Sequence, residues 1–245
     1  MSIASQMYKD GVLIHEFRDT PSLTRLFEKI SEMNSSPSGK FHWKMKYPGT
    51  EDFRPNVYEY DSSFLDVLFE SEVSEMIKNS THKNLCLAHI QLRRVFPGPS
   101  YMSWHRDTHF KDSDVVSSSP PAYKIIFFPD INNNKLPCIS MLKGSHLCHM
   151  VNQRSDSFIS PGFSQFDKQI LDSGMFENIT LSSSKRQFAF FDTSIMHSAA
   201  SSADSNGSIR LIYVFIDKDQ FEKTFAKKPE HRNLNKIFQE RIKNG

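Results

Sequence analysis

The sequence predicts a mainly β domain with flanking helices, and three observations support this fold class. Strand-length apolar runs fill the middle of the chain, at 85–96, 122–128, 136–142, 186–191 and 209–216. Apolar residues at helical spacing occur mainly at the two ends. The 21 phenylalanines suit a well-filled β core. A chain of 245 residues is long enough for one large domain with a sizeable core.

The first 84 residues predict a strand followed by two packing helices. Residues 11–17 form the expected strand, and Thr20 with Pro21 is a typical helix start, as N-cap and first-turn residue. A second helix is expected from Ser62 or Ser63 through Ile77, with its acidic face in solvent. The segment between the helices, 41–55, is aromatic and predicted to be irregular.

The long strand 85–96 is expected to place alternate side chains on opposite faces. Cys86, Ala88, Ile90 and Leu92 would share one face, while Leu87, His89, Gln91 and Arg93 would share the other. The polar segment 111–121 is either a lid or an ordinary surface loop. An insertion over 151–185 carries a short helix at 165–171, and two helices separated by Pro229 follow residue 217.

Composition favours a cytoplasmic protein without a nucleic-acid or membrane partner. The net charge of +2 is too small to predict binding to an anionic polymer or surface. The three cysteines form no Cys-x-x-Cys pair, which suggests reduced thiols. The first residues lack the apolar segment of a signal peptide, and no apolar run approaches the ~20 residues of a spanning helix.

His105 and Asp107 are the candidate metal ligands around which the other motifs are arranged. In an extended strand these two side chains point the same way, and they are two of the three ligands of a non-haem Fe(II) oxygenase. His197, at the end of an apolar strand-like run, offers the third. A lone His-x-Asp also occurs on ordinary surface strands, so this pattern needs support from elsewhere in the chain.

Arg210 gives that support, because it lies near the start of the buried-looking strand 209–216. A buried guanidinium needs an anion, either a local acidic side chain or a carboxylate held through two hydrogen bonds. Its position after His197 suits a cosubstrate that reaches from the metal to the arginine.

Several motifs resemble, in the same order, those of the phytanoyl-CoA dioxygenase family of Fe(II)/2-oxoglutarate oxygenases. They are Lys9 to Ile14, Trp104-His105-Arg106-Asp107, Asp130 to Asn134, Lys143-Gly144-Ser145-His146, and Phe191 to His197 followed by Arg210. Lys143 replaces the proline of the family motif, and His146 matches a structural turn histidine. Another departure is Ser198-Ala199, where a hydroxyl two residues after the distal histidine is missing.

The resemblance implies a single domain over 1–245 with a double-stranded β-helix (jelly-roll, cupin-like) core at about 85–216. Residues 1–84 would support it, and residues 217–245 would form C-terminal helices. It further implies Fe(II), 2-oxoglutarate and O2 as cofactor and cosubstrates. His105, Asp107 and His197 would bind the metal, and Arg210 would hold 2-oxoglutarate. Lys124 matches a position at which relatives contact 2-oxoglutarate, although a lysine at a strand end is otherwise often solvent-exposed. Gln91 is a further candidate because antiparallel pairing brings its strand close to the metal face.

The substrate predicted by these motifs is a small molecule, with an anionic one suggested by Arg93 and His109. Both are expected on the cavity side by alternation, whereas Arg106 should point away. These cations could instead pair with acids of the 111–121 loop. Because related halogenases have Gly or Ala at the position of Asp107, the aspartate implies hydroxylation or another oxidation. The sequence is silent on the oligomeric state.

Two other functions stay open. A zinc-dependent hydrolase could use His105 and Asp107 with His109 or His197, because zinc also favours histidine and carboxylate ligands. The chain could also be a non-catalytic β-helix binding protein.

Overall fold

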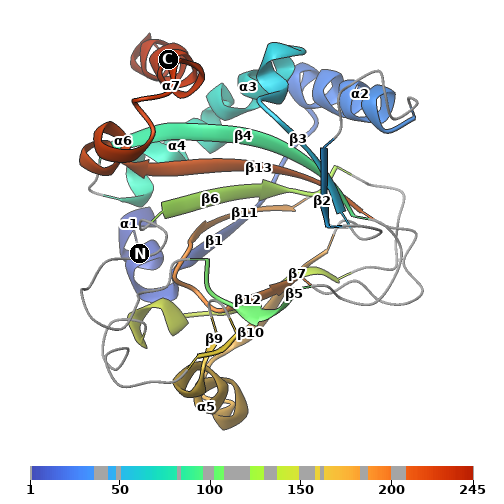
Figure 1. Ribbon diagram of the computed structural model, residues 1–245. Helices are drawn as coiled ribbons and strands as arrows, with labels where there is room; N and C mark the ends of the chain where they lie inside the picture. The colour runs from blue at the N-terminus through green and yellow to red at the C-terminus, as the bar shows by residue number, and fades with distance from the viewer. Residues whose placement is uncertain are drawn as a thin grey trace.

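Two facing antiparallel sheets form the centre of the protein (Figure 1). This computed structural model describes residues 2–35, 44–47, 51–81, 84–95, 102–107, 122–129, 137–148, 158–160, 163–182, 187–199 and 208–244. The large sheet has the order β1-β11-β6-β13-β4-β3-β2 and the small sheet the order β10-β7-β12-β5. The large sheet consists of β1 (Val12–Glu16), β2 (Lys44–Tyr47), β3 (Glu51–Pro55), β4 (Leu85–Val95), β6 (Ala122–Phe127), β11 (Gln187–Asp192) and β13 (Ser208–Asp217). The small sheet consists of β5 (Met102–His105), β7 (Pro137–Leu142), β10 (Asn178–Ser182) and β12 (His197–Ala199).

The chain passes repeatedly from one sheet to the other. Strands β4, β6, β11 and β13 lie in the large sheet, while β5, β7, β10 and β12 lie in the small one. The two sets alternate along the chain except at β7 and β10, which have no large-sheet strand between them. Such alternation between two facing antiparallel sheets is a double-stranded β-helix, so the predicted fold class is confirmed. A separate short hairpin joins β8 (Phe158–Ser160) to β9 (Phe163–Ser164).

The helices cover the outer face of the large sheet and the far side of the small one (Figure 1). Most of them precede β4 or follow β13: α1 (Ile3–Asp10), α2 (Pro21–Ser35), α3 (Ser63–Asp66), α4 (Ser71–Ser80), α6 (Lys218–Thr224) and α7 (Pro229–Asn244). Helix α5 (Gln165–Ser173) lies beyond the small sheet, and short 3-10 turns are η1 (Val57–Glu59), η2 (Val67–Phe69) and η3 (Ser145–Cys148). The Thr20 cap is confirmed, since its hydroxyl accepts the Leu23 amide at 3.3 Å.

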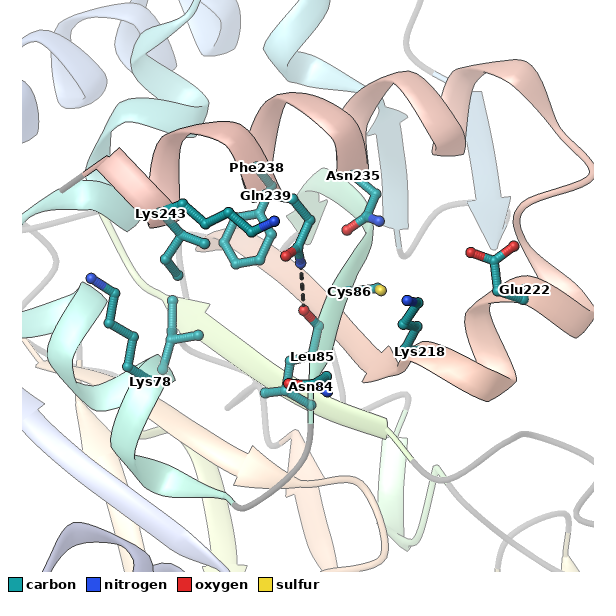
Figure 2. Close-up of a pocket in the computed structure, with 12 residues that line it drawn as sticks. Lys78, Asn84, Leu85, Cys86, Lys218, Glu222, Asn235, Phe238, Gln239 and Lys243 are labelled. Carbon is teal, nitrogen blue, oxygen red and sulfur yellow. Dashed lines mark hydrogen bonds between the residues drawn. The ribbon is translucent and has the colours of Figure 1, made fainter.

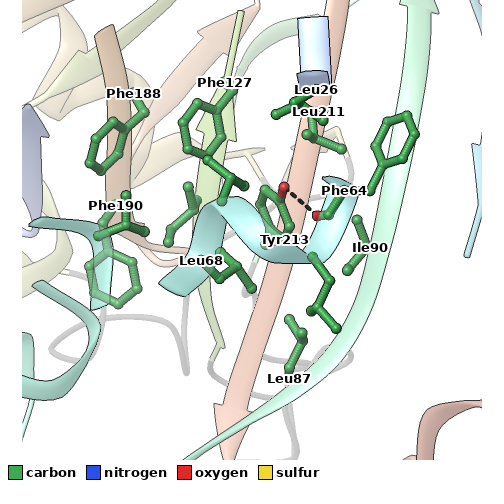
Figure 3. Packing of buried hydrophobic residues seen from close by; sticks show 14 of the residues in the cluster. Leu26, Phe64, Leu68, Leu87, Ile90, Phe127, Phe188, Phe190, Leu211 and Tyr213 are labelled. Atoms are coloured by element: carbon green, nitrogen blue, oxygen red, sulfur yellow. Dashed lines mark hydrogen bonds between the residues drawn. The ribbon is translucent and has the colours of Figure 1, made fainter. Parts of the chain in front are cut away.

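Two apolar cores lie on opposite faces of the large sheet. The outer core joins helices α2, α3, α4 and α7 to residues such as Phe188, Phe190 and Tyr213 (Figure 3). The Tyr213 hydroxyl donates to the Phe64 carbonyl at 2.7 Å, so the one polar atom of this buried ring has a partner. The inner core lies between the sheets and includes Met141 from β7 and Ile212 from β13.

Two predictions for the first 84 residues are wrong. The segment 41–55 was expected to be irregular, yet β2 and β3 extend the large sheet, with β3 paired to the second half of β4. The helix expected from Ser62 to Ile77 is divided into α3, η2 and α4, because Glu70 adopts an extended ψ of 137° between them. Residues before 85 therefore contribute strands as well as helices.

The simple alternation expected along β4 is also wrong, because the strand contains a β-bulge. Its partner β13 pairs Phe215 with Leu87 and the adjacent Val214 with His89, so Ala88 is the extra residue. Leu87 and Ile90 consequently both face the outer core, whereas Ala88 faces the inner one. Beyond the bulge, Gln91 lies opposite the inner-core residue Ile212. The bulge therefore leaves Gln91 on the face toward the small sheet.

Helix α7 covers the edge of β4 that β3 does not reach. Three polar side chains one turn apart bond to the β4 backbone: His231 to the Ala88 carbonyl at 2.7 Å, Asn235 to the Leu87 amide at 3.1 Å and Gln239 to the Leu85 carbonyl at 2.8 Å. Since β3 pairs only with Gln91 to Val95, these contacts continue the pairing of an otherwise open edge.

A cavity of about 530 Å³ lies beside this edge, between α4, β4, α6 and α7 (Figure 2). Cys86, Lys218 and Gln239 are among its lining residues, but none of the predicted site residues is. Within the described part of the chain, no helix has both the length and the apolar character needed to cross a membrane.

Candidate metal and anion site

His105, Asp107 and His197 come together at one end of the small sheet. His105 is the last residue of β5 and His197 the first of β12, and these two residues are direct partners in the antiparallel register. One ligand atom from each of the three residues lies within 4.8 Å of the others. The structure thus assembles the three side chains that the sequence selected.

Asp107 and His197 both differ from their expected strand positions. Strand β5 ends at His105, so Asp107 follows the strand and is fixed by its amide, which donates to the Thr193 carbonyl at 3.0 Å. His197 does not end an apolar strand, because β11 stops at Asp192 and a turn separates it from β12. The turn lies at the polar residues 192–194, between two apolar segments, and the Asp192 carboxylate stabilises it by accepting the Ser194 amide at 2.8 Å.

Both histidines are oriented by backbone carbonyls. His105 Nδ1 lies 2.8 Å from the Ser103 carbonyl, and His197 Nδ1 lies 3.0 Å from the Ile195 carbonyl. A carbonyl only accepts, so each Nδ1 carries a proton, and Nε2 is the ring nitrogen that a neutral imidazole would offer to a metal. His197 Nε2 lies 3.2 Å from one Asp107 oxygen, and His105 Nε2 lies 3.9 Å from the other. This carbonyl-to-Nδ1 bond is the usual support of a metal-binding histidine.

The pKa values of His105 and Asp107 match the protonation states that a metal requires of its ligands. Burial, together with the nearby His197, lowers the pKa of His105 to about 4. Burial alone would raise the pKa of Asp107, but Lys124 and His197 hold it well below its usual range. A neutral imidazole and an ionised carboxylate are the forms that bind cations.

The donor set fits a divalent metal ion. Two imidazoles and one carboxylate on one side of an ion, with the other positions open, form the facial arrangement of non-haem Fe(II) sites. Among the described residues, the buried Nε2 of His105 has no hydrogen-bond partner, as expected for an atom meant to bind a ligand.

Lys124 lies against the cluster. Its ammonium is 2.6 Å from Asp107 Oδ2, and its strand position opposite Val214 places it on the inner face of the large sheet. The family resemblance assigned Lys124 to 2-oxoglutarate, and its contact in the structure is with the proposed ligand Asp107.

Arg210 also faces the space between the sheets. Its side chain is 4% exposed, and it precedes the inner-core residue Ile212 by two positions in β13. The guanidinium carbon is 5.9 Å from the centre of the Phe128 ring. Its Nε has no hydrogen-bond partner, and no acidic side chain pairs with it, among the residues that the structure describes. A buried cation in this state is suited to receive an anion.

Gln91 and Arg93 share that inner face. Gln91 is buried opposite Ile212, and the partly buried Arg93 is the direct cross-strand neighbour of Arg210. Side chains directly opposite one another point to the same side of a sheet, so two cations and an amide converge there. His109 and the 111–121 segment lie outside the described residues, as do parts of the 151–185 insertion.

The pairing of Arg106 with Asp167 near the cluster was not predicted. Arg106 does point away from the ligands as predicted, but it is buried and forms an ion pair with Asp167 of α5 at 2.7 Å. The two residues are 61 positions apart, and nothing in the local sequence marks the pair.

His146 behaves as the structural histidine that was expected, since its Nε2 bonds to the Tyr8 carbonyl at 2.9 Å.

Neither a protein-family model nor a curated protein sequence matches the chain. Solved structures do match it in fold. One is the non-haem alpha-ketoglutarate-dependent epimerase SnoN from nogalamycin biosynthesis, at 13% identity over 88% of this chain and 82% of that one, with a TM-score of 0.62. A second is EctD from S. alaskensis, solved with 2-oxoglutarate and 5-hydroxyectoine, at 12% identity over 88% and 75% of the two chains, with a TM-score of 0.62.

The carbocyclase SnoK, also alpha-ketoglutarate-dependent, matches at 11% identity over 88% of this chain and 83% of its own, with a TM-score of 0.60. At such identities the likeness establishes a common architecture. The chain therefore has the double-stranded β-helix fold of these non-haem iron, 2-oxoglutarate-dependent enzymes.

Proposed function

We propose that the protein is an Fe(II)- and 2-oxoglutarate-dependent dioxygenase similar to the phytanoyl-CoA dioxygenase family. It would oxidise a small-molecule metabolite and release succinate and CO2, within one domain spanning 1–245. The observation that carries the proposal is the combination of the His-Asp-His cluster with the buried Arg210 on the facing sheet. Neighbours in fold whose structures hold Fe3+ with alpha-ketoglutarate (SnoN) or 2-oxoglutarate (EctD) support it.

In this proposal the cluster holds the metal through His105 Nε2, His197 Nε2 and an Asp107 oxygen. The bound iron would supply the activation of O2 coupled to decarboxylation of 2-oxoglutarate. The Ser103 and Ile195 carbonyls keep both imidazole rings in the tautomer that leaves Nε2 free. Lys124 offsets the negative charge of Asp107 at the edge of the site.

Arg210 would bind the 5-carboxylate of 2-oxoglutarate. A guanidinium can hold a carboxylate through two parallel hydrogen bonds, and its burial removes competition from water. Gln91 and Lys124 point to the same inter-sheet space, so we assign them to the 2-oxoglutarate pocket as well.

The inner face of the large sheet, which carries Arg210, also suggests the class of substrate. Arg93 adds a cation beside Arg210, which favours a substrate carrying a carboxylate, phosphate or similar anion. His109 remains a candidate for the same role. Neighbours in fold act on or hold small molecules, nogalamycin RO in SnoN and 5-hydroxyectoine in EctD, which supports a small metabolite here. The retained Asp107 favours hydroxylation over halogenation.

We also propose that the enzyme is located in the cytoplasm.

The test is substrate-stimulated succinate release from a metabolite library under Fe(II), O2 and ascorbate. We expect His197→Ala to lose most metal affinity and turnover while staying folded. His15→Ala, at an exposed position of β1, is the matched control and should keep both. Undiminished iron binding and turnover in His197→Ala would show the assignment to be wrong.

The same assay separates the alternatives. Two histidines and a carboxylate also suit zinc, so a hydrolase predicts activity with Zn(II) and no succinate. A non-catalytic binding protein predicts ligand binding without succinate under any metal.

A further inference from the structure

Arg106 lies in the chain between two proposed metal ligands and is buried. Its side chain is 2% exposed although it carries a charge. It points away from the cluster, toward α5 and η3. A fully buried guanidinium beside a metal site requires an explanation, because its desolvation is costly unless it is well bonded.

Its contacts join four separate parts of the chain. The Nε donates to Asp167 Oδ1 in α5 at 2.7 Å, and Asp167 itself is 2% exposed. The Nη1 donates to the Ser145 carbonyl of η3 at 3.0 Å and to the Ser194 carbonyl. The end of β5, α5, η3 and the turn before β12 are thus held by one side chain.

Two of those parts carry the ligands. Arg106 adjoins both His105 and Asp107, and Ser194 lies in the turn that leads to His197. The same turn is bonded twice more, since Thr193 accepts the Asp107 amide at 3.0 Å and Ser145 Oγ accepts the Met196 amide at 2.9 Å. The bonds of Arg106 and Ser145 therefore fix the first ligand segment relative to the second.

The charge on Asp167 fixes Arg106 in turn. A neutral side chain could fill the same volume, and a buried ion pair is weak evidence for added stability. What the pair does supply is a fixed orientation of the Arg106 side chain. Its planar guanidinium must direct its N–H groups to Asp167 and to the Ser145 and Ser194 carbonyls at the same time. A change in the position of α5 would consequently displace the turn that leads to His197.

We propose that Arg106 and Asp167 form a positioning pair, which sets the geometry of the His105, Asp107 and His197 cluster and couples helix α5 to it. The inference rests on the proposed function to the extent that the cluster binds a metal. Residues that orient metal ligands from outside the ligand set typically affect metal affinity by 10–100-fold, and this is the effect expected here.

The experiment compares Arg106→Met and Asp167→Asn with a matched control, Asp66→Asn. The control removes the negative charge from another Arg–Asp pair of 2.7 Å, between Arg241 and Asp66, which is formed by α7 and α3 on the outer side of the large sheet. Co(II) affinity is measured by absorbance titration of folded protein, and the free energy of unfolding is measured in urea.

We expect both site variants to bind Co(II) at least tenfold more weakly, with an altered Co(II) absorption spectrum, while Asp66→Asn loses stability only. Arg106→Lys, which keeps the charge but not the fork, should lie between Arg106→Met and wild type. Asp167→Asn retains an acceptor for Arg106, and it decides the question if Arg106→Met fails to fold.

Wild-type Co(II) affinity and spectrum in folded Asp167→Asn and Arg106→Lys, with only stability reduced, would overturn the positioning role and leave the proposed function intact. A wild-type protein that binds neither Co(II) nor Fe(II) would overturn the proposed function, and this inference with it.

Discussion

Arg210 and Lys124 are both cations on the inner face of the large sheet, yet they have different surroundings. Lys124 already has an anionic partner in Asp107 at 2.6 Å. Arg210 is buried without such a partner among the described residues. The difference implies that an incoming carboxylate depends more on Arg210 than on Lys124.

We therefore expect Arg210→Met to raise the half-saturating 2-oxoglutarate concentration far more than Lys124→Met does. Loss of one partner of a desolvated charged pair costs about 2–5 kcal/mol, which is roughly 30-fold or more in affinity. Titration of succinate release against 2-oxoglutarate measures the effect, and the substrate requirement should change little in Arg210→Met. The reverse ranking of the two variants would mean that their roles are exchanged.

The sequence predicted the candidate metal ligands better than the residues that hold them in position. His105, Asp107 and His197 could be selected because metal chemistry restricts ligands to few residue types. Asp167 could not, since a long-range pair of Arg and Asp leaves no local pattern. Lys124 was assigned by the family resemblance alone, and its contact with Asp107 depends on a strand register that no spacing reveals.

At the level of strands and helices, the predictions failed where the backbone departs from regular geometry. The apolar runs located β4, β6, β7, β11 and β13 because buried strands need continuous hydrophobic faces. The bulge at Ala88 was invisible, because one extra residue changes the pairing and not the composition. Strands β2 and β3 have only four and five residues, and they were missed because such short segments show too little of a strand pattern.

The hydrogen bonds from α7 to the edge of β4 should contribute to the stability of the fold. Asn235→Ala removes the acceptor of the Leu87 amide and should lower the free energy of unfolding by about 1–3 kcal/mol, the typical cost of an unsatisfied buried donor. Urea denaturation measures the change. Lys236→Ala, an exposed neighbour on the same helix, should stay within about 0.5 kcal/mol of wild type. Equal effects of the two substitutions would argue against a role of α7 in covering the strand edge.

The candidate site spans both sheets of the protein. Its ligands come from the small sheet and the residues beside it, while Lys124, Gln91 and Arg210 come from β6, β4 and β13 of the large one. Metal and 2-oxoglutarate bound together would consequently link the sheets across the inner core.

We expect this link to raise the resistance of the protein to unfolding. A ligand present at one hundred times its Kd stabilises the native state by about 2.7 kcal/mol. Thermal unfolding with Co(II) and 2-oxoglutarate, under anaerobic conditions, should show a higher midpoint that EDTA reverses. Arg210→Met should keep the metal part of the shift and lose most of the 2-oxoglutarate part, and His197→Ala should lose both. A shift that persists in His197→Ala would indicate metal binding elsewhere.

The register partnership of His105 with His197 has a consequence for the newly made chain. During synthesis His105 and Asp107 leave the ribosome long before His197 exists, so the nascent polypeptide offers a metal ion only two of the three candidate ligands. The third arrives when β12 inserts between β5 and β7, and such long-range pairing is a slow step of β-rich folding. In the proposed function, the metal would therefore be bound by the completed two-sheet fold and not by its precursors.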